Sequence, residues 1–299
     1  MGAGGFWEDV WTNVFASALY TAILALGIVC ISALLLRKQR KRLFRVLSLD
    51  DRAPVLRIFV SRLDVLPAGS QGTDGRLAVG FVGPALMQLE YQGGREVCRL
   101  LEEPFLDILP DAARRLLEGR GRYLADVDVH IDVSPARDGG QTLLENGRDS
   151  IVLLGTDVYS PVVRDIYRQS TSFVKVVSEA TGEDFDASSP DDGDPTFAVR
   201  LDGKWHSLEG RAAGREVGTI QRVTLASGRR VLMCAGLSAS TTSGSARHFA
   251  KHWKALDEQF GDDDFLVVLA FTGQQADSPI LQEPDRLLDF ERRRPVPRA

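Results

Sequence analysis

Two segments of the sequence place small and polar residues directly after an apolar run, a position where α/β proteins bind ligands. In the first, Ser150–Leu154 is followed by a Gly-Thr-Asp triplet, and in the second, Arg230–Ala235 is followed by small residues. Glycine lets a backbone approach closely, and free N–H groups at a helix start favour an anion. We predict that these segments bind a phosphate or carboxylate through Gly155, Thr156, Asp157, Arg164, Gly236, Ser240, Thr241, Thr242, Ser243, Gly244 and Arg247.

Two acidic residues could add chemistry to such a site. Asp157 follows the first apolar run and could accept a hydrogen bond from a ribose hydroxyl, although it could equally cap the next helix. Glu90 lies in the largely apolar stretch ALMQLEY and could face a pocket, although an exposed helix position is more common for glutamate. Both are therefore candidate catalytic acids.

Familiar catalytic motifs are absent from the sequence. Neither segment matches G-x-G-x-x-G or G-x-x-x-x-G-K-[ST], and no serine stands in G-x-S-x-G. His248 and His252 have the i, i+4 spacing of metal ligands, but no third ligand is fixed and H-E-x-x-H is missing, so we expect no metal site. The three scattered cysteines favour a reducing compartment over a disulfide framework. No cofactor is identified.

Alternating apolar strands and helices must position these residues. The pattern predicts an α/β fold in which a mostly parallel, Rossmann-like sheet has helices on both faces. We expect Gly236–Gly244 to be a loop and Glu183–Pro195 to be a flexible acidic insertion. The predicted strands are Leu56–Leu63, Leu77–Val82, Val127–Val133, Ser150–Leu154, Phe173–Val177, Phe197–Leu201, Val217–Leu225, Arg230–Ala235 and Phe265–Phe271, and the predicted helices are Pro84–Glu102, Asp111–Leu117, Pro161–Gln169 and Ser245–Phe260.

A long uncharged segment precedes this domain. Val14–Leu36 contains no charged residue, and as a helix it would extend about 35 Å, enough for a bilayer core of about 30 Å. A soluble core helix is seldom apolar on all sides for so long, and a cleaved signal peptide would need a basic start, whereas Glu8 and Asp9 precede this segment. We therefore predict one transmembrane helix in contact with the lipid bilayer.

Charge predicts the orientation of that helix. Residues 1–45 hold six basic and two acidic side chains, and the basic ones, Arg37 to Arg45, follow the apolar segment. Positive flanks stay inside, so we expect an extracytoplasmic N-terminus, a cytoplasmic domain and a place in the cell membrane. Leu43, Phe44 and Leu47 could also form an interfacial helix on anionic lipid. The rest of the chain has a net charge of −9, which argues against general nucleic-acid binding.

The predicted organisation has five parts. These are an extracytoplasmic N-terminus (1–13), a transmembrane helix (14–36), a basic juxtamembrane segment (37–52), a cytosolic α/β domain (53–272) and a disordered tail (273–299). The membrane helix, the helix that begins at Gly83-Pro84 and the two loops at 154–157 and 235–244 resemble uncharacterised bacterial single-pass membrane proteins with a cytosolic Rossmann-like domain. The resemblance covers residues 55–271 and implies an α/β fold with a ligand at the loop edge, but it transfers no catalytic residue.

Three functions remain open at this point. The first is a membrane-tethered domain that binds a nucleotide-like or other anionic small molecule, as a sensor or regulator. The second is a hydrolase of nucleosides or dinucleotides that uses Glu90 or Asp157. The third is a protein-interaction module without a ligand. The sequence does not define the oligomeric state.

Overall fold

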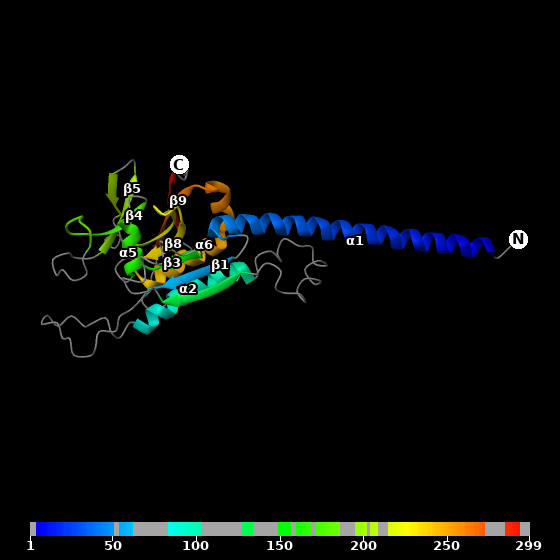
Figure 1. Cartoon of the computed structure of the whole chain (residues 1–299), viewed down its shortest axis with the longest axis horizontal. Helices are drawn as coiled ribbons and strands as arrows, with labels where there is room; N and C mark the ends of the chain where they lie inside the picture. Colours follow the sequence, from blue (N-terminus) through cyan, green and yellow to red (C-terminus); the bar gives the residue numbers. More distant parts are fainter. Residues whose placement is uncertain are drawn as a thin grey trace.

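A long N-terminal helix leads into an α/β domain. The computed structural model describes residues 4–50, 54–61, 83–102, 127–133, 149–156, 160–168, 172–185, 195–201, 204–208, 215–272 and 285–293. The first helix, α1 (Gly4–Leu47), projects from the domain as a single rod (Figure 1). The predicted strand at 77–82 and the predicted helix at 111–117 lie outside the described residues.

The projecting part of α1 is apolar and uncovered. Trp11–Leu47 is long and apolar enough to cross a membrane, with a mean hydropathy of 2.5 in its most apolar window, and it is the one such helix in the described part of the chain. Phe15 and Tyr20 are 70% and 69% exposed. An exposed apolar surface of this length is costly in water and favourable in lipid, so these observations agree with the predicted span at 14–36.

A seven-stranded mixed sheet forms the centre of the domain, in the order β10-β9-β7-β8-β3-β1-β2. The four strands β8, β3, β1 and β2 are parallel to one another, whereas β7, β9 and β10 each pair antiparallel with their neighbours. The sheet is thus parallel on one side and antiparallel on the other. Its strands are β1 (Val55–Val60), β2 (Asp128–Val133), β3 (Ser150–Leu154), β7 (Arg215–Thr224), β8 (Arg230–Gly236), β9 (Asp264–Thr272) and β10 (Asp285–Arg293).

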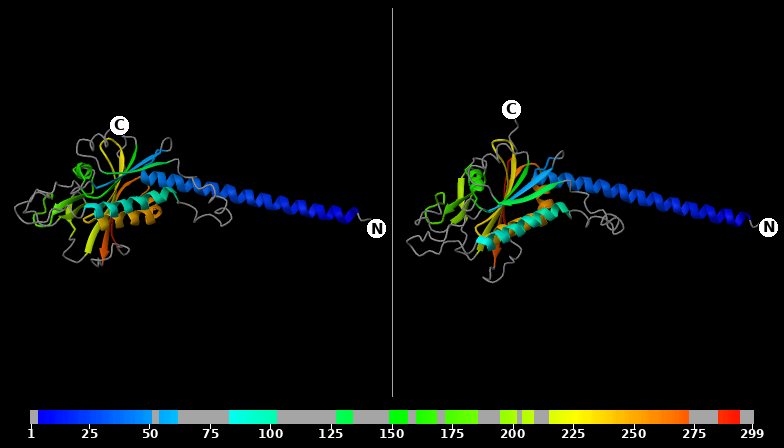
Figure 2. Two further views of the ribbon diagram at one scale, coloured as in Figure 1. Left: turned by 90° about the horizontal axis from the view of Figure 1, so that it is seen from below. Right: turned by 60° about the horizontal axis from the view of Figure 1, so that its bottom comes forward.

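Both faces of the sheet are covered, because alternate side chains of each strand point to opposite sides. Helices α2 (Gly83–Glu102) and α6 (Ala239–Phe260) pack side by side on one face, as Figure 2 shows. The short helix α5 (Pro161–Tyr167) and a small antiparallel sheet pack on the other face. This arrangement explains why all of Ser150–Leu154 is buried. The small sheet contains β4 (Val174–Ser178), β5 (Pro195–Leu201) and β6 (Lys204–Ser207).

Two adjacent glycines bring α2 close to its neighbours. A Cβ atom on Gly93 would lie 3.0 Å from the Cα of Ser243 in α6, and one on Gly94 would lie 3.4 Å from Cγ2 of Ile58 in β1. Glycine costs an isolated helix about 1 kcal/mol relative to alanine. Here its small size permits close packing of α2 on α6 and on the sheet.

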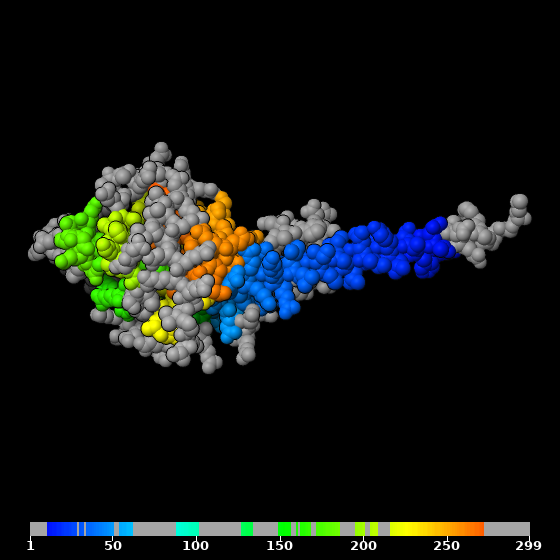
Figure 3. Space-filling model, turned by 90° about the horizontal axis from the view of Figure 1, so that it is seen from above, coloured from blue at the N-terminus to red at the C-terminus, as the bar shows by residue number. Residues whose placement is uncertain are grey.

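The last turns of α1 belong to the core of the domain. Leu43, Phe44 and Leu47 are between 1% and 4% exposed, in the same apolar cluster as Trp253 of α6. The predicted interfacial helix on lipid is therefore wrong for these side chains, which cover α6 instead. Figure 3 shows the base of α1 against the part of the chain that contains the end of α6.

Two other predictions differ from the structure. Helix α6 begins at Ala239 and not at Ser245, because Ser238 and Thr241 form a reciprocal capping box that starts the helix within the expected loop. The expected disorder of residues 273–299 does not hold for Asp285–Arg293, which pair with β9 as β10. Strand β9 thus provides a pairing partner for a segment whose polar composition predicted disorder.

Candidate functional site

The connections of the sheet diverge between β1 and β3. From β1 the chain passes through α2 on one face of the sheet and then enters β2. From β3 it passes through α5 on the opposite face and later enters β8, which lies on the side of β3 away from β1. In open α/β sheets, a ligand crevice forms at such a divergence, beyond the carboxyl ends of the strands. We call this side of the sheet the carboxyl edge; it contains Ser61, Gly155 and Gly236.

Three residues meet at this divergence. Ser61 directly follows β1, Gly155 directly follows β3, and Glu90 reaches them from α2. The backbone N–H of Ser61 donates to Oε2 of Glu90 at 2.7 Å, and its hydroxyl donates to Oε1 at 3.0 Å. Glu90 is 4% exposed and Ser61 is 3% exposed. We call Ser61, Glu90 and Gly155 the switch-point cluster.

Only glycine fits at position 155. Its φ angle of +111° is one that other residues rarely adopt. A Cβ atom there would lie 2.1 Å from the hydroxyl oxygen of Ser61 and 3.3 Å from Oε1 of Glu90. The backbone N–H of Gly155 donates to the carbonyl of Cys234 in β8, which holds the turn in register. The glycine therefore makes room for the Ser61 hydroxyl, which donates to Glu90.

Burial changes the acidity of Glu90. Desolvation raises the pKa of Glu90 from 4.5 to about 7, although the two hydrogen bonds from Ser61 favour the charged form and oppose the rise. A carboxyl group with this pKa can either donate or accept a proton near neutral pH. Such a group at a ligand crevice is a candidate for acid–base chemistry or for binding a hydroxyl group.

The hydroxyl groups of the second predicted segment serve the start of α6. Thr241 and Ser238 cap each other, and Thr242 donates to the carbonyl of Gly236 at 3.3 Å. The hydroxyl of Ser238 also donates to the Glu216 carboxylate at 2.6 Å, so an acidic group already lies beside this helix N-terminus. Ser240 lies 2.8 Å from the Ser238 hydroxyl, while Ser243 and Gly244 lie in the next turn. This segment is thus less available to an anion than the sequence suggests.

The two predicted segments nevertheless lie at one edge. Gly155 bonds to β8 just before Gly236, and Ser243 packs against Gly93, which is three residues from Glu90 on α2. The carboxyl ends of β1, β3 and β8 and the first turns of α6 therefore lie at the same edge as the switch-point cluster.

Other predicted residues are not brought into the cluster. Thr156 is buried next to it, but Asp157 lies outside the described residues. Arg164 is exposed on α5 and Arg247 is exposed on α6, on opposite faces of the sheet. The rings of His248 and His252 are 4.3 Å apart, and no group of three potential metal ligands occurs among the residues with a described placement.

Ser61 is the site residue that the sequence prediction missed. The predicted strand continued to Leu63, which would have placed Ser61 within it, whereas β1 ends at Val60. The available signal is a polar residue directly after a buried apolar run, the position that Gly155 and Thr156 occupy after Ser150–Leu154.

Comparison with known proteins identifies no relative: no protein-family model, no curated protein and no solved structure matches the chain.

Proposed function

We propose that this chain is a membrane-tethered, Rossmann-like domain on the cytoplasmic side of the cell membrane, which binds a nucleotide-like or other anionic small molecule as a sensor or regulator. One observation carries the proposal: Ser61, Glu90 and Gly155 meet where the connections of β1 and β3 diverge. In doubly wound α/β proteins that bind dinucleotides, an acidic residue near this edge of the sheet binds a ribose hydroxyl. We assign that role to Glu90, with the sugar of the ligand beside Ser61 and Gly155.

The burial of the cluster has a consequence for binding. Because Glu90 and Ser61 are almost inaccessible, a ligand can reach them only if the carboxyl edge opens. Binding would then be coupled to a change in the domain, which is what a sensor requires.

A ligand screen on the full chain in lipid nanodiscs tests this proposal. The full chain is needed because the end of α1 is part of the core. We expect at least one nucleotide in a panel of mono-, di- and cyclic nucleotides to raise the melting temperature, and Glu90→Gln to weaken that ligand about tenfold or more. Glu96→Gln, on the same helix and paired with Arg99, is the matched control and should bind normally. No shift with any nucleotide, or equal losses in the two variants, would contradict the proposal.

A hydrolase is the second candidate, favoured by the pKa of Glu90 near 7. In that case Glu90 would act as a general acid or base on a nucleoside or dinucleotide. Turnover of such a substrate by the wild type and its loss in Glu90→Gln would distinguish the enzyme from a binding domain. Turnover that is unchanged in the variant would remove Glu90 from this role.

A further inference from the structure

The part of α1 that follows the uncharged segment has one face on the domain and another that is exposed. Leu43 and Leu47 are buried in the apolar cluster of the domain, whereas Arg37, Lys38 and Lys41 are exposed. Successive residues of a helix are about 100° apart around its axis, so these three cations fall within about 100° of one another. We call Arg37, Lys38 and Lys41 the basic face of α1.

The other three basic residues of this segment are already engaged. Arg42 and Arg45 donate to the carboxylate of Asp257 at 2.7 Å and 2.8 Å. The guanidinium of Arg40 lies 4.7 Å from the centre of the Phe44 ring. By contrast, no hydrogen bond or ion pair joins a side chain of the basic face to any residue that the structure describes. The basic segment therefore divides by role, and only the basic face is left to meet a partner outside the domain.

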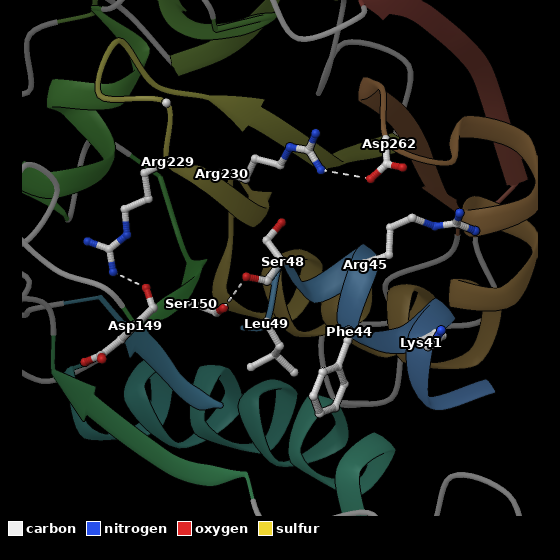
Figure 4. Close-up of a pocket in the computed structure, with 11 residues that line it drawn as sticks. Lys41, Phe44, Arg45, Ser48, Leu49, Asp149, Ser150, Arg229, Arg230 and Asp262 are labelled. Atoms are coloured by element: carbon white, nitrogen blue, oxygen red, sulfur yellow. Dashed lines mark hydrogen bonds and ion pairs between the residues drawn. The ribbon is translucent and has the colours of Figure 1, made fainter. Parts of the chain in front are cut away.

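Acidic side chains at the base of α1 do not neutralise the basic face. A cavity of about 720 Å³, whose lining includes Lys41, lies where the last turns of α1 meet the domain (Figure 4). The two aspartates in this lining are paired with arginines of the domain. Asp262 accepts from Arg230 at 3.1 Å, and Asp149 accepts from Nε of Arg57 at 2.6 Å. Neither aspartate forms an ion pair with Lys41, so this part of the domain leaves its charge in place.

Exposed apolar side chains come just before the basic face on the same side of α1. Leu34 is 66% exposed and Ile31 is 60% exposed. Leu34 precedes Arg37 by three residues, and Ile31 precedes Lys38 by seven, spacings that bring side chains to the same side of a helix. This side of α1 therefore offers exposed apolar surface followed by cations, which matches the order of acyl chain and phosphate in a phospholipid.

The depth of the basic face in a bilayer would also match the lipid phosphates. Arg37 and Lys41 are one and five residues beyond Leu36, or about 1.5 Å and 7.5 Å along the helix axis. The headgroup layer of a bilayer is roughly 5–8 Å thick on each side of the hydrocarbon. The chain after Arg45 has a net charge of −9, so an anionic bilayer attracts the basic face while it repels the domain as a whole.

We propose that the basic face of α1 binds the headgroups of anionic phospholipids in the leaflet on the domain side of the membrane. The proposal rests on the proposed insertion of α1 into a membrane, but it does not depend on a ligand at the carboxyl edge. Because the cations occupy one side of the helix, the anionic lipids would gather on that side of α1 and not around it.

Titration of the detergent-solubilised full chain, followed by native mass spectrometry, tests the proposal. The probes are phosphatidylglycerol, zwitterionic phosphatidylcholine and inorganic phosphate. A cation near a charged lipid surface contributes about fivefold in affinity, so Lys38→Gln should weaken phosphatidylglycerol binding about fivefold. Substitution of all three residues of the basic face by glutamine should weaken it about fiftyfold or more. Because these side chains are exposed, their substitution should leave the domain folded.

Arg40→Gln is the matched control within the basic segment. Arg40 is two residues from Lys38 but is packed on Phe44, and the two basic residues are about 160° apart around the helix. Its substitution should therefore change phosphatidylglycerol binding by less than about twofold. Arg95→Gln removes the same charge from an exposed position on α2 and should have no effect on lipid binding.

Equal weakening by Lys38→Gln and Arg40→Gln would overturn the proposal, and so would equal binding of the two lipids. Binding of inorganic phosphate as tight as that of phosphatidylglycerol would overturn the lipid as the source of the anion. Reconstitution into phosphatidylcholine nanodiscs separates this proposal from the one on which it rests. A chain that does not enter them would overturn both, whereas one that enters but shows no preference for phosphatidylglycerol would overturn this proposal alone. Glu90→Gln should leave lipid binding unchanged, so a failed nucleotide screen and a failed lipid titration are distinguishable.

Discussion

The two edges of the central sheet solve the problem of buried polar groups in different ways. At the carboxyl edge, Glu90 is held by hydrogen bonds from Ser61, and its pKa rises to about 7. At the opposite edge, where β3 and β8 begin, Asp257 is equally buried but is held by Arg42 and Arg45, and it stays paired with opposite charge. An isolated buried carboxyl group can gain or lose a proton, whereas a paired one fixes a joint. The first edge thus holds a carboxyl group that can titrate near neutral pH, and the second holds one that joins α1 to the domain.

Removal of the charge on Asp257 should have the largest effect. In Asp257→Asn, the guanidinium groups of Arg42 and Arg45 lose the carboxylate that accepts from both, so we expect a loss of about 3–4 kcal/mol in unfolding free energy. For a domain of this size, that corresponds to a fall of roughly 6–16 °C in melting temperature. Calorimetry of the full chain in detergent measures it.

Glu258→Gln is the matched control for this variant. Glu258 also pairs with Arg42, at 2.9 Å, but its side chain is 70% exposed, so its substitution should cost less than about 1 kcal/mol. Equal losses in the two variants would show that burial does not distinguish these pairs, and would contradict the view that Asp257 fixes α1 to the domain.

The pH dependence of stability should single out the carboxyl edge. Because the folded pKa of Glu90 is above its unfolded value of 4.5, the folded state holds the proton more tightly. The resulting stabilisation is complete below about pH 4.5 and is lost as pH rises to about 7, a change on the order of 3 kcal/mol. Denaturant unfolding across this range should show the wild type losing stability relative to Glu90→Gln, which cannot titrate. Parallel curves for the two proteins would place Glu90 in a solvated environment.

A methyl group at position 155 should separate backbone strain from crowding. Gly155→Ala forces alanine into a positive φ and against the Ser61 hydroxyl, and we expect a loss of about 2–3 kcal/mol. Gly182 also has a positive φ, of +71°, but a Cβ there meets nothing within 4 Å, so Gly182→Ala should cost only about 1 kcal/mol. Unfolding free energies compare the two. A smaller loss of unfolding free energy in Gly155→Ala than in Gly182→Ala would show that the switch-point cluster can accommodate a methyl group.

The smallest expected change in stability concerns an exposed ion pair. Asp262 is 61% exposed where it pairs with Arg230, so Asp262→Asn should lower the free energy of unfolding by less than about 0.5 kcal/mol. Asp184→Asn breaks a similar exposed pair with Lys175 on the small sheet and should cost as little. Denaturant unfolding measures both variants, and a loss in either that approaches the loss in Asp257→Asn would contradict the comparison.

The sequence predicted those features that depend on local patterns. The uncharged run at 14–36 lies within α1, and the apolar run at Ser150–Leu154 forms the buried strand β3. Glu90 is a candidate because it lies in a largely apolar stretch of sequence, and the structure does bury it inside the domain. These features follow from the hydrophobicity of a segment and the spacing of its apolar residues, both of which can be read from a short stretch of sequence alone.

Features that depend on distant partners could not be predicted. The burial of Leu43 and Phe44 depends on α6, which is some 200 residues away, and a basic flank has the same sequence whether it covers lipid or protein. The early start of α6 depends on Ser238, which caps the helix, and on the burial of Thr241 and Thr242. These tertiary contacts outweigh the low helix propensity of threonine. The ion pairs at the base of α1 depend on which arginine engages which aspartate, and only the assembled fold determines that.

Helix α6 connects the two edges as one stiff element. Ser243 packs against α2 near the switch-point cluster, and Asp257 holds α1; the two lie about 21 Å apart along the helix axis. If binding of a ligand opened the carboxyl edge and tilted α6, the base of α1 would therefore move with it. The orientation of α1 would then depend on the state of a site on the far side of the domain.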